Sequence, residues 1–217
     1  MSDYILQLRT AFRPPDMTPE GLISRYSQYY LGIKAFFDTH RHLLKQTPVR
    51  VFLLDNTISS LDELPTKLSK LIEDEIPEVH FFGDNLWGSQ NKGAGEIQGV
   101  QYMLSEIQKH RWFIHFCPRQ QIKSSYFISS FLEAPRELFT VNVNPPPHFN
   151  TGLYATSTDS IFRFVSQFTD ARLRTMVLRK ESLEHLMYAH YKSTGVPFSV
   201  LDKMDLYWFA PEGRYDW

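Results

Sequence analysis

The sequence has very little cysteine and no excess of either charge. Cys117 is the single cysteine among 217 residues, so the chain can form neither an internal disulfide nor a cysteine-based zinc site. Lysine and arginine number 23, against 24 aspartate and glutamate residues, which leaves no basic field for nucleic acid. We therefore expect no nucleic-acid partner, and the cysteine content favours a reducing compartment.

Long hydrophobic runs are also missing. No segment approaches the roughly 18 apolar residues that a membrane span needs, and the N-terminal stretch MSDYILQLRTAFRPPDM lacks the pattern of a signal peptide. We expect no membrane span and a cytoplasmic protein. The hydrophobic fraction of 42% is ordinary for a globular chain, and the length favours one domain over residues 1–217.

What the sequence does contain is an alternation of apolar runs and helical periodicity. Buried strands are indicated at Tyr4–Phe12, Val49–Asn56, Val79–Phe82 and Trp112–Phe116, with apolar residues three and four positions apart in the segments between them. This order predicts an α/β fold, a single-domain and mostly parallel sheet with helices on both faces. Further on, the sequence predicts a helix over Ile122–Leu132 and strands at FTVNV and TGLYAT.

Polar residues follow each of the first four predicted strands. They are Arg13, then Asp55 and Asn56, then Asp84 and Asn85, and finally Arg119. Ligands of parallel α/β sheets bind at the carboxyl ends of the strands. These positions are therefore the first candidates for a binding site.

The stretch GDNLWGSQNKGAGEIQGVQYML, residues 83–104, suggests a phosphate-binding turn, but it fits neither common pattern. A P-loop needs lysine and a hydroxyl residue after its second glycine. Gly88 and Gly93 have the right spacing, but Ala94 and Gly95 follow them. The dinucleotide pattern fails as well, because Gly93, Gly95 and Gly99 are spaced G-x-G-x-x-x-G and stand well after the strand.

Four segments occur in an order that resembles the GT-A-fold glycosyltransferases. They are LQLRTAFR, VFLLDNTIS, NKGAGEIQGVQYML and WFIHFCPR, and together they cover Leu6–Arg119. The resemblance implies a GT-A-like fold related to inverting nucleotide-diphospho-sugar transferases. It further implies a nucleotide-binding half over 1–120 and an acceptor half over 121–217. The implied partners are a nucleotide-sugar donor and a sugar or glycan acceptor.

The resemblance also implies a donor site, in which Asp55 contacts the nucleotide base. The full set is Arg13, Asp55, Asn56, Asn91, Lys92, Gly93 and Arg119. An alternative for Lys92 is a solvated loop lysine. The family's metal-binding D-X-D motif is missing, because the chain has HFCPRQ there and Arg119 replaces the last acidic residue. A guanidinium can neutralise a diphosphate, so we expect no metal and no cofactor. His115, in mid-strand, is expected to be a core residue.

The second half offers acceptor and catalytic candidates. His148, Asn150 and Thr151 follow a proline-rich turn and present groups suited to a sugar, although a purely structural turn is an equal alternative. Glu181 and Glu184 correspond to the acidic positions of the family's E-D helix, which supplies the general base. Glu181 is slightly favoured over Glu184. A solvated helix face is the alternative for both.

Two functions follow. The leading one is a metal-independent glycosyltransferase, and the alternative is a non-catalytic GT-A-like binding or assembly protein that has lost the motif. A homo-oligomer is compatible with both. The aromatic tail, with Tyr207, Trp208, Tyr215 and Trp217, could stack on a ligand, but core or dimer contacts are favoured.

Overall fold

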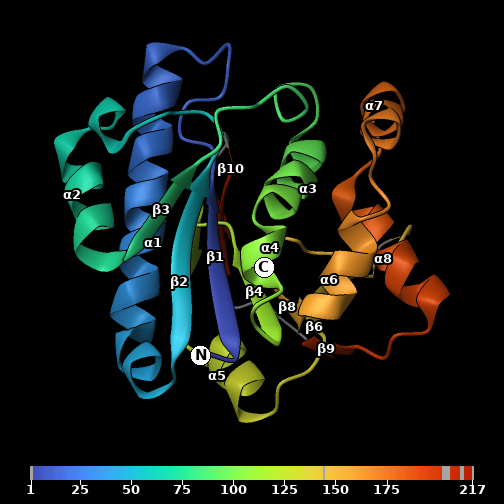
Figure 1. Ribbon diagram of the computed structural model, residues 1–217. Helices are drawn as coiled ribbons and strands as arrows, with labels where there is room; N and C mark the ends of the chain where they lie inside the picture. Colours follow the sequence, from blue (N-terminus) through green and yellow to red (C-terminus); the bar gives the residue numbers. More distant parts are fainter. Residues whose placement is uncertain (1, 144, 202–205, 211–212, 217) are drawn as a thin grey trace.

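An eight-stranded sheet runs through the molecule (Figure 1). The computed structural model describes residues 2–143, 145–201, 206–210 and 213–216. The strands lie in the order β3 (Glu78–Phe81), β2 (Val49–Asp55), β1 (Tyr4–Thr10), β4 (Trp112–Phe116), β8 (Leu153–Ser157), β6 (Leu138–Asn142) and β7 (His148–Phe149), and β9 (Ser199–Leu201) pairs with β6. The first four are mutually parallel, whereas β8 is antiparallel to both of its neighbours. The predicted α/β, mostly parallel sheet is confirmed.

Helices cover both faces of this sheet (Figure 1). One face carries α1 (Pro19–Gln46), the 3-10 turn η1 (Leu61–Glu63), α2 (Thr66–Glu75) and α5 (Tyr126–Glu133). The other carries α3 (Lys92–Tyr102), α4 (Leu104–Ile107), α6 (Thr158–Val165), α7 (Asp170–Leu178) and α8 (Leu183–Thr194). Within the described residues, no helix is both long and apolar enough to cross a membrane.

A small second sheet consists of β5 (Gln120–Ile122), β10 (Leu206–Ala210) and β11 (Gly213–Asp216). The helix expected from Ile122 is therefore wrong at its start: Ile122 pairs with Leu206 in this sheet, and α5 begins only at Tyr126. The tail side chains expected to stack or pack, those of residues 207, 208, 215 and 217, lie outside the described part of the chain.

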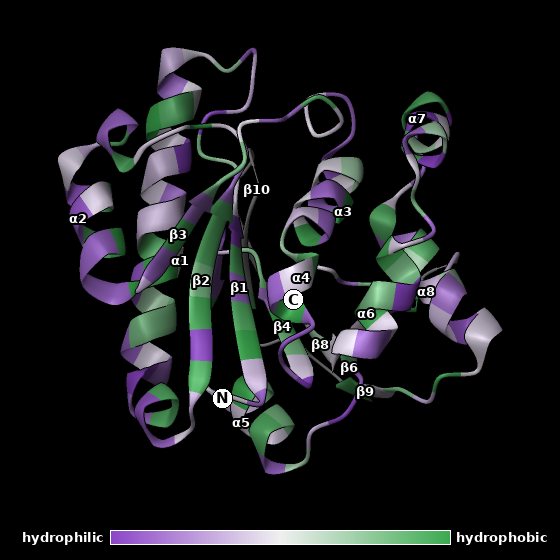
Figure 2. Cartoon of the chain, in the orientation of Figure 1, coloured by the Kyte–Doolittle hydropathy of each residue, from purple (hydrophilic) through white to green (hydrophobic). Residues whose placement is uncertain are grey.

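Alternation along β1 divides its side chains between two cores. Leu6 and Leu8 pack on the α1 side, whereas Ile5 packs on the α3 side. Gln7 and Arg9 lie two and four residues after Ile5, so they also face α3. In Figure 2, β2 is mostly hydrophobic because it is buried between the two helical layers, and α2 is mostly hydrophilic because much of it faces solvent. Polar side chains on the α3 side of the central strands are thus exceptions that call for a reason.

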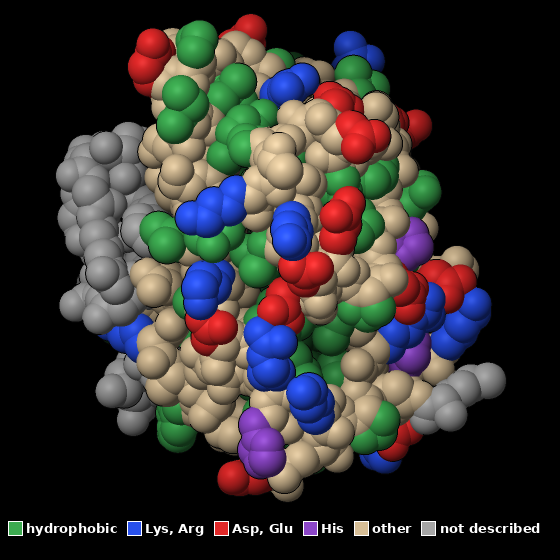
Figure 3. All heavy atoms as spheres, turned by 90° about the vertical axis from the view of Figure 1, so that its left-hand side faces the viewer, with side chains coloured by type: hydrophobic (Ala, Val, Ile, Leu, Met, Phe, Trp, Pro, Cys, Tyr) green, Lys and Arg blue, Asp and Glu red, His purple; other side chains and the backbone are tan. Residues whose placement is uncertain are grey.

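The outer surface of α1 and α2 mixes charges of both signs (Figure 3). Arg41 of α1 pairs with Glu75 of α2 at 2.5 Å, and Lys34 pairs with Asp38 one turn along α1. Such interspersed charges keep a surface soluble without creating a field for a charged polymer.

Helix α1 is capped at its N-terminus and lies very close to the chain that follows β4. Thr18 caps its N-terminus, accepting a hydrogen bond from the Gly21 N–H at 3.1 Å. In the middle of the helix, a Cβ added at Gly32 would stand 1.9 Å from the carbonyl oxygen of Pro118 and 2.6 Å from that of Gln120. Only glycine allows this approach, which fixes the segment that carries Arg119.

We predict that Gly32→Ala lowers the free energy of unfolding by about 1–3 kcal/mol, because the added methyl forces α1 away from backbone atoms that cannot yield. Gly21→Ala in the same helix is the matched control, since its Cβ would meet only side-chain atoms, Met17 Cε at 3.2 Å and the capping Thr18 Oγ1 at 3.3 Å, and no backbone atom. Urea unfolding of both variants measures the difference. Equal stability of the two variants would contradict the close packing at Gly32.

Candidate functional site

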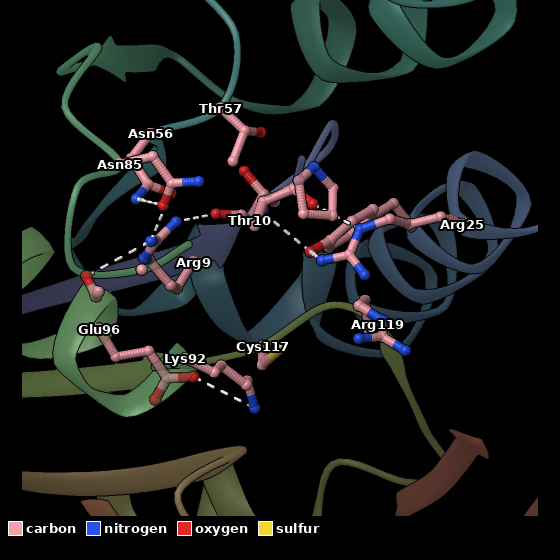
Figure 4. Close-up of a pocket in the computed structure, with 15 residues that line it drawn as sticks. Arg9, Thr10, Arg25, Asn56, Thr57, Asn85, Lys92, Glu96, Cys117 and Arg119 are labelled. Carbon is pink, nitrogen blue, oxygen red and sulfur yellow. Dashed lines mark hydrogen bonds and ion pairs between the residues drawn. The ribbon is translucent and has the colours of Figure 1, made fainter. Parts of the chain in front are cut away.

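A cavity of about 210 Å³ lies at the carboxyl ends of β1, β2 and β4, next to the first turn of α3 (Figure 4). Four cationic side chains line it, those of Arg9, Arg25, Lys92 and Arg119. Glu96 is the one carboxylate among the described lining residues. The cavity therefore carries an excess of positive charge, although the chain as a whole has a net charge of -1.

Four different elements supply these cations. Arg9 is on β1, Arg25 on α1, Lys92 is the first residue of α3, and Arg119 follows β4. The strands β1 and β4 are parallel neighbours, so their carboxyl ends meet at one edge of the sheet. The long helix α1 follows β1 and brings Arg25 to the same edge. Parallel pairing thus concentrates charges that are up to 110 positions apart in sequence, Arg9 and Arg119.

Arg9 is the buried member of the set, with 6% of its surface exposed. Its Nη2 donates to Asn56 Oδ1 at 2.7 Å, and its Nη1 donates to the backbone oxygen of Leu54 at 3.4 Å. Asn56 Nδ2 donates in turn to Asn85 Oδ1 at 2.6 Å. This series of hydrogen bonds links the end of β1, the end of β2 and the loop after β3 into one wall of the cavity.

Arg25 and Arg119 lie on the opposite side of the cavity (Figure 4). Arg25 Nε donates to the Ala11 carbonyl oxygen at 2.5 Å, and its guanidinium lies 5.5 Å from the centre of the Tyr29 ring. Arg119 Nε donates to Gln28 Oε1 at 3.3 Å. Each guanidinium has five N–H donors in a planar fork, so both can hold these anchoring bonds and bind an anion as well.

Lys92 and Glu96 form an ion pair one turn apart on α3, with Lys92 Nζ 3.2 Å from Glu96 Oε1. The Glu96 side chain is only 9% exposed, whereas that of Lys92 is 60% exposed. The Glu96 carboxylate raises the pKa of Lys92, which therefore stays charged at neutral pH. Lys92 does line the cavity, as the donor-site prediction required, and it is paired rather than only solvated.

Close packing of two glycines holds the loop after β3 against α3. A Cβ on Gly95 would lie 2.5 Å from Gly88 Cα, and a Cβ on Gly88 would lie 2.2 Å from Asn85 Oδ1. Both glycines line the cavity. The glycine-rich stretch therefore serves to bring two backbone segments together beside the site, and it does not form a P-loop.

A second, more open hollow of about 570 Å³ adjoins the cavity and shares Asn56, Thr57 and Asn85 with it. Arg13 lines this outer hollow and pairs with Glu63 at 3.3 Å. The structure thus separates Arg13 from the other predicted donor-site cations, which lie in the cavity. The two hollows therefore lie side by side at the ends of the strands, with Asn56, Thr57 and Asn85 bordering both.

Asp55 does not line either hollow, contrary to its expected place against a base. It is completely buried, and its carboxylate accepts four hydrogen bonds. The donors are the N–H groups of Phe12 at 2.9 Å, Thr57 at 2.6 Å and Ile58 at 3.1 Å, together with the Thr57 hydroxyl at 2.7 Å. Asp55 therefore fixes the turns after β1 and β2 and orients Thr57.

Asn91 and Gly93 are also used for structure and do not line the cavity. Asn91 Oδ1 caps α3 by accepting from the Ala94 N–H at 3.1 Å, and its Nδ2 donates to the Glu181 carbonyl oxygen at 3.0 Å. A Cβ on Gly93 would stand 2.7 Å from Leu183 Cβ. Both residues join the start of α3 to the start of α8, and of the predicted turn only Lys92 reaches the cavity.

The acceptor and catalytic candidates divide into two groups. Glu184 Oε1 accepts from the Thr151 hydroxyl at 3.1 Å and Oε2 accepts from the Ser182 hydroxyl at 2.9 Å. Burial raises the pKa of Glu184, but hydrogen bonds from its own N–H, Ser182 and Thr151 and the charge of Lys92 outweigh this and lower the pKa overall. Glu181, the favoured candidate, instead pairs with Arg172. The structure brings Glu184, and not Glu181, to Thr151.

The remaining acceptor candidates are His148 and Asn150. The His148 ring is 4.6 Å from the His185 ring, on the helix that carries Glu184. Asn150 Oδ1 accepts from the Gly152 N–H at 3.2 Å, which holds the turn before β8. His115 is 1% exposed, as expected of a core residue. Burial lowers its pKa to about 3, so the ring is neutral.

Sequence reasoning missed three charged residues of the cavity, Arg9, Arg25 and Glu96. Arg9 had a usable signal, because it is a charged residue inside the apolar run YILQLRTAF, whose strand is buried. Arg25 and Glu96 had none, since each is a charged residue within an ordinary helical pattern. Only the packing of α1 and α3 against the sheet shows that these two face the cavity.

The donor set does not fit the divalent cation that D-X-D-bearing GT-A enzymes bind. The residues after β4 are Cys117, Pro118 and Arg119, none of which is an oxygen-rich anionic ligand. Among the residues that the structure describes, no group of three or more histidine, cysteine, aspartate or glutamate side chains is arranged to hold a metal ion.

Comparisons with known proteins agree with this architecture at the level of the fold. No protein-family model and no curated protein sequence matches the chain. Among solved structures, it is similar to a protein from Desulfovibrio desulfuricans G20 that is provisionally assigned as a nucleotide-diphospho-sugar transferase. The TM-score is 0.57 at 9% sequence identity, over 93% of this chain and 80% of that one. The chain has a fold like that of a nucleotide-diphospho-sugar transferase.

Proposed function

We propose that the protein binds a nucleotide-diphosphate sugar and transfers its sugar to an acceptor hydroxyl without a bound metal. The observation that carries the proposal is the convergence of Arg9, Arg25, Lys92 and Arg119 on one cavity at the carboxyl ends of the parallel strands. A diphosphate is the part of such a donor that matches this charge. Guanidinium groups bind phosphate oxygens bidentately and neutralise charge that develops on a leaving group.

The nucleoside lies in the outer hollow in this proposal. Asn56, Thr57 and Asn85 offer amide and hydroxyl groups there, and they also border the cavity, so one ligand can extend across both. Asp55 supports this arrangement indirectly, since its carboxylate holds Thr57 in place at 2.6 and 2.7 Å. Arg13 closes the far side of the hollow.

Glu184 is the general base of the proposed transfer, with inversion at the anomeric carbon. Its lowered pKa keeps it ionised at neutral pH, and the Thr151 hydroxyl holds it in position. The acceptor oxygen forms a bond to the anomeric carbon and gives its proton to Glu184. The bond from that carbon to the diphosphate oxygen breaks, and the electron pair leaves with the diphosphate against Arg119 and Lys92.

A second candidate function is non-catalytic binding of the same donor. It is favoured by the state of Glu184, whose two oxygens both accept hydrogen bonds within the protein, at 3.1 and 2.9 Å. A carboxylate oxygen has a further lone pair for an acceptor hydroxyl, so proton transfer remains compatible with these bonds. Turnover decides between the two functions.

We predict that UDP, GDP or ADP binds with a dissociation constant that Arg119→Met raises about 10- to 100-fold, the usual worth of a charge-assisted hydrogen bond. Titration calorimetry measures the affinity. Protection of Cys117 from a thiol reagent reports on the site independently, because Cys117 lines the cavity and the chain has no other cysteine.

Arg163→Met is the matched control, since it removes the same charge from the exposed surface of α6. The affinity of this control should equal that of the wild type, and EDTA should not change binding. If none of the nucleoside diphosphates binds or protects Cys117, the proposed function is wrong.

We predict further that Glu184→Gln reduces transfer from the donor by about 100- to 10,000-fold, the usual contribution of a general base, while donor affinity changes little. Product formation under single-turnover conditions gives the rate. Glu181→Gln is the informative comparison, because Glu181 is engaged with Arg172 and should lose less. A greater loss in Glu181→Gln would assign the base to Glu181. No turnover by the wild type with any acceptor offered would favour the binding function.

A further inference from the structure

Glu96 is out of place in a cavity built for an anion. It lines the same cavity as four cations, and its side chain is only 9% exposed. A carboxylate there repels a diphosphate, while the ion pair with Lys92 at 3.2 Å offsets the cost of burying its charge. Glutamine would fit the same space without the repulsion. The position therefore calls for a ligand group that a carboxylate binds better than an amide does.

The surroundings of Glu96 define that group. Lys92 Nζ lies 3.2 Å away, so the pair presents an acceptor and a donor side by side, and both border the cavity (Figure 4). A carboxylate beside a cationic hydrogen-bond donor suits neighbouring hydroxyl groups, which both donate and accept.

The groups near the Lys92–Glu96 pair narrow the assignment. Arg9, Arg25 and Arg119 line the same cavity and would hold the diphosphate. Glu184, the proposed base, lies near enough to Lys92 for its charge to raise the pKa of Lys92. The starts of α3 and α8 are in direct contact there, through the hydrogen bond of 3.0 Å from Asn91 to the Glu181 carbonyl. The group to be transferred must lie between the leaving diphosphate and the base.

Resting on the proposed function, we infer that Glu96 accepts hydrogen bonds from hydroxyl groups of the donor's glycosyl moiety and, with Lys92, determines which sugar is bound. Glu96 then opposes the diphosphate and favours the sugar. This gives the site a preference for the intact donor over the nucleoside diphosphate that remains after transfer. Product release benefits from the same repulsion.

The test compares Glu96→Gln with the wild type by calorimetry, using UDP and GDP and then UDP-glucose, UDP-N-acetylglucosamine and GDP-mannose. The quantity of interest is the ratio of the two dissociation constants, diphosphate over diphosphate sugar. We expect Glu96→Gln to bind the diphosphate as tightly as the wild type or more tightly. For the preferred sugar, we expect the ratio to fall about tenfold or more, the loss of a hydrogen bond to a charged group.

Two further variants make the result interpretable. Glu96→Asp keeps the charge but withdraws the oxygens by one methylene, so it should reduce the ratio without improving diphosphate binding. Glu133→Gln removes an exposed carboxylate from α5 at the other end of the sheet and should leave every affinity unchanged. Thermal unfolding of each variant confirms that the fold is intact.

The outcomes separate this inference from the proposed function. If the wild type binds no diphosphate at all, the proposed function itself fails. If it binds diphosphates, but no sugar alters the affinity, or Glu96→Gln weakens diphosphate and diphosphate sugar by the same factor, then Glu96 does not contact the sugar and this inference alone is wrong. A ratio that falls in Glu96→Gln while the diphosphate affinity holds supports it.

Discussion

The site depends on one buried hydrogen bond, from the Arg9 guanidinium to the Asn56 amide oxygen at 2.7 Å. A buried cation is destabilising unless its N–H groups find acceptors. The two terminal nitrogens of Arg9 meet this condition by donating to polar atoms at the ends of β1 and β2, whereas its Nε has no partner among the described atoms. Asn56 donates in turn to Asn85. A charge can therefore stand at the centre of the sheet edge, and the other cations of the cavity are arranged around it.

The polar residues at the strand ends divide into those that hold the backbone and those that face the cavity. Asp55 and Asn91 belong to the first kind, because their side-chain oxygens accept hydrogen bonds from backbone N–H groups of the adjacent turns and helix start. Asn56, Lys92 and Arg119 belong to the second. The division has a simple cause: a tight turn leaves N–H groups without partners, and the nearest short polar side chain supplies the acceptor.

The contact between α3 and α8 relates the two halves of the chain. Gly93 allows the start of α3 to lie against Leu183, and Asn91 bonds to the carbonyl oxygen of Glu181. As a result Lys92, which lines the cavity, is also near the group formed by Thr151 and Glu184. A ligand with a diphosphate and a sugar has the same sequence of properties, an anionic part followed by a hydroxyl-bearing part. The cation-lined cavity and the neighbouring Thr151–Glu184 group therefore correspond to the two parts of such a ligand.

The sequence by itself determined the parallel sheet, its first four strands and the edge at which the cavity lies, because the alternation of apolar runs and amphipathic helices allows few other arrangements. It also singled out Asn56 and Arg119, which stand at or just after the ends of predicted strands, and Lys92, which the resemblance to GT-A-fold transferases indicated. Only the tertiary structure decided that Asp55 is buried under its turn, that Glu184 rather than Glu181 meets Thr151, and that Arg25 and Glu96 face the cavity. A side chain on a helix can face any direction until the helix is packed, and a carboxylate binds backbone or ligand according to which donors lie nearest.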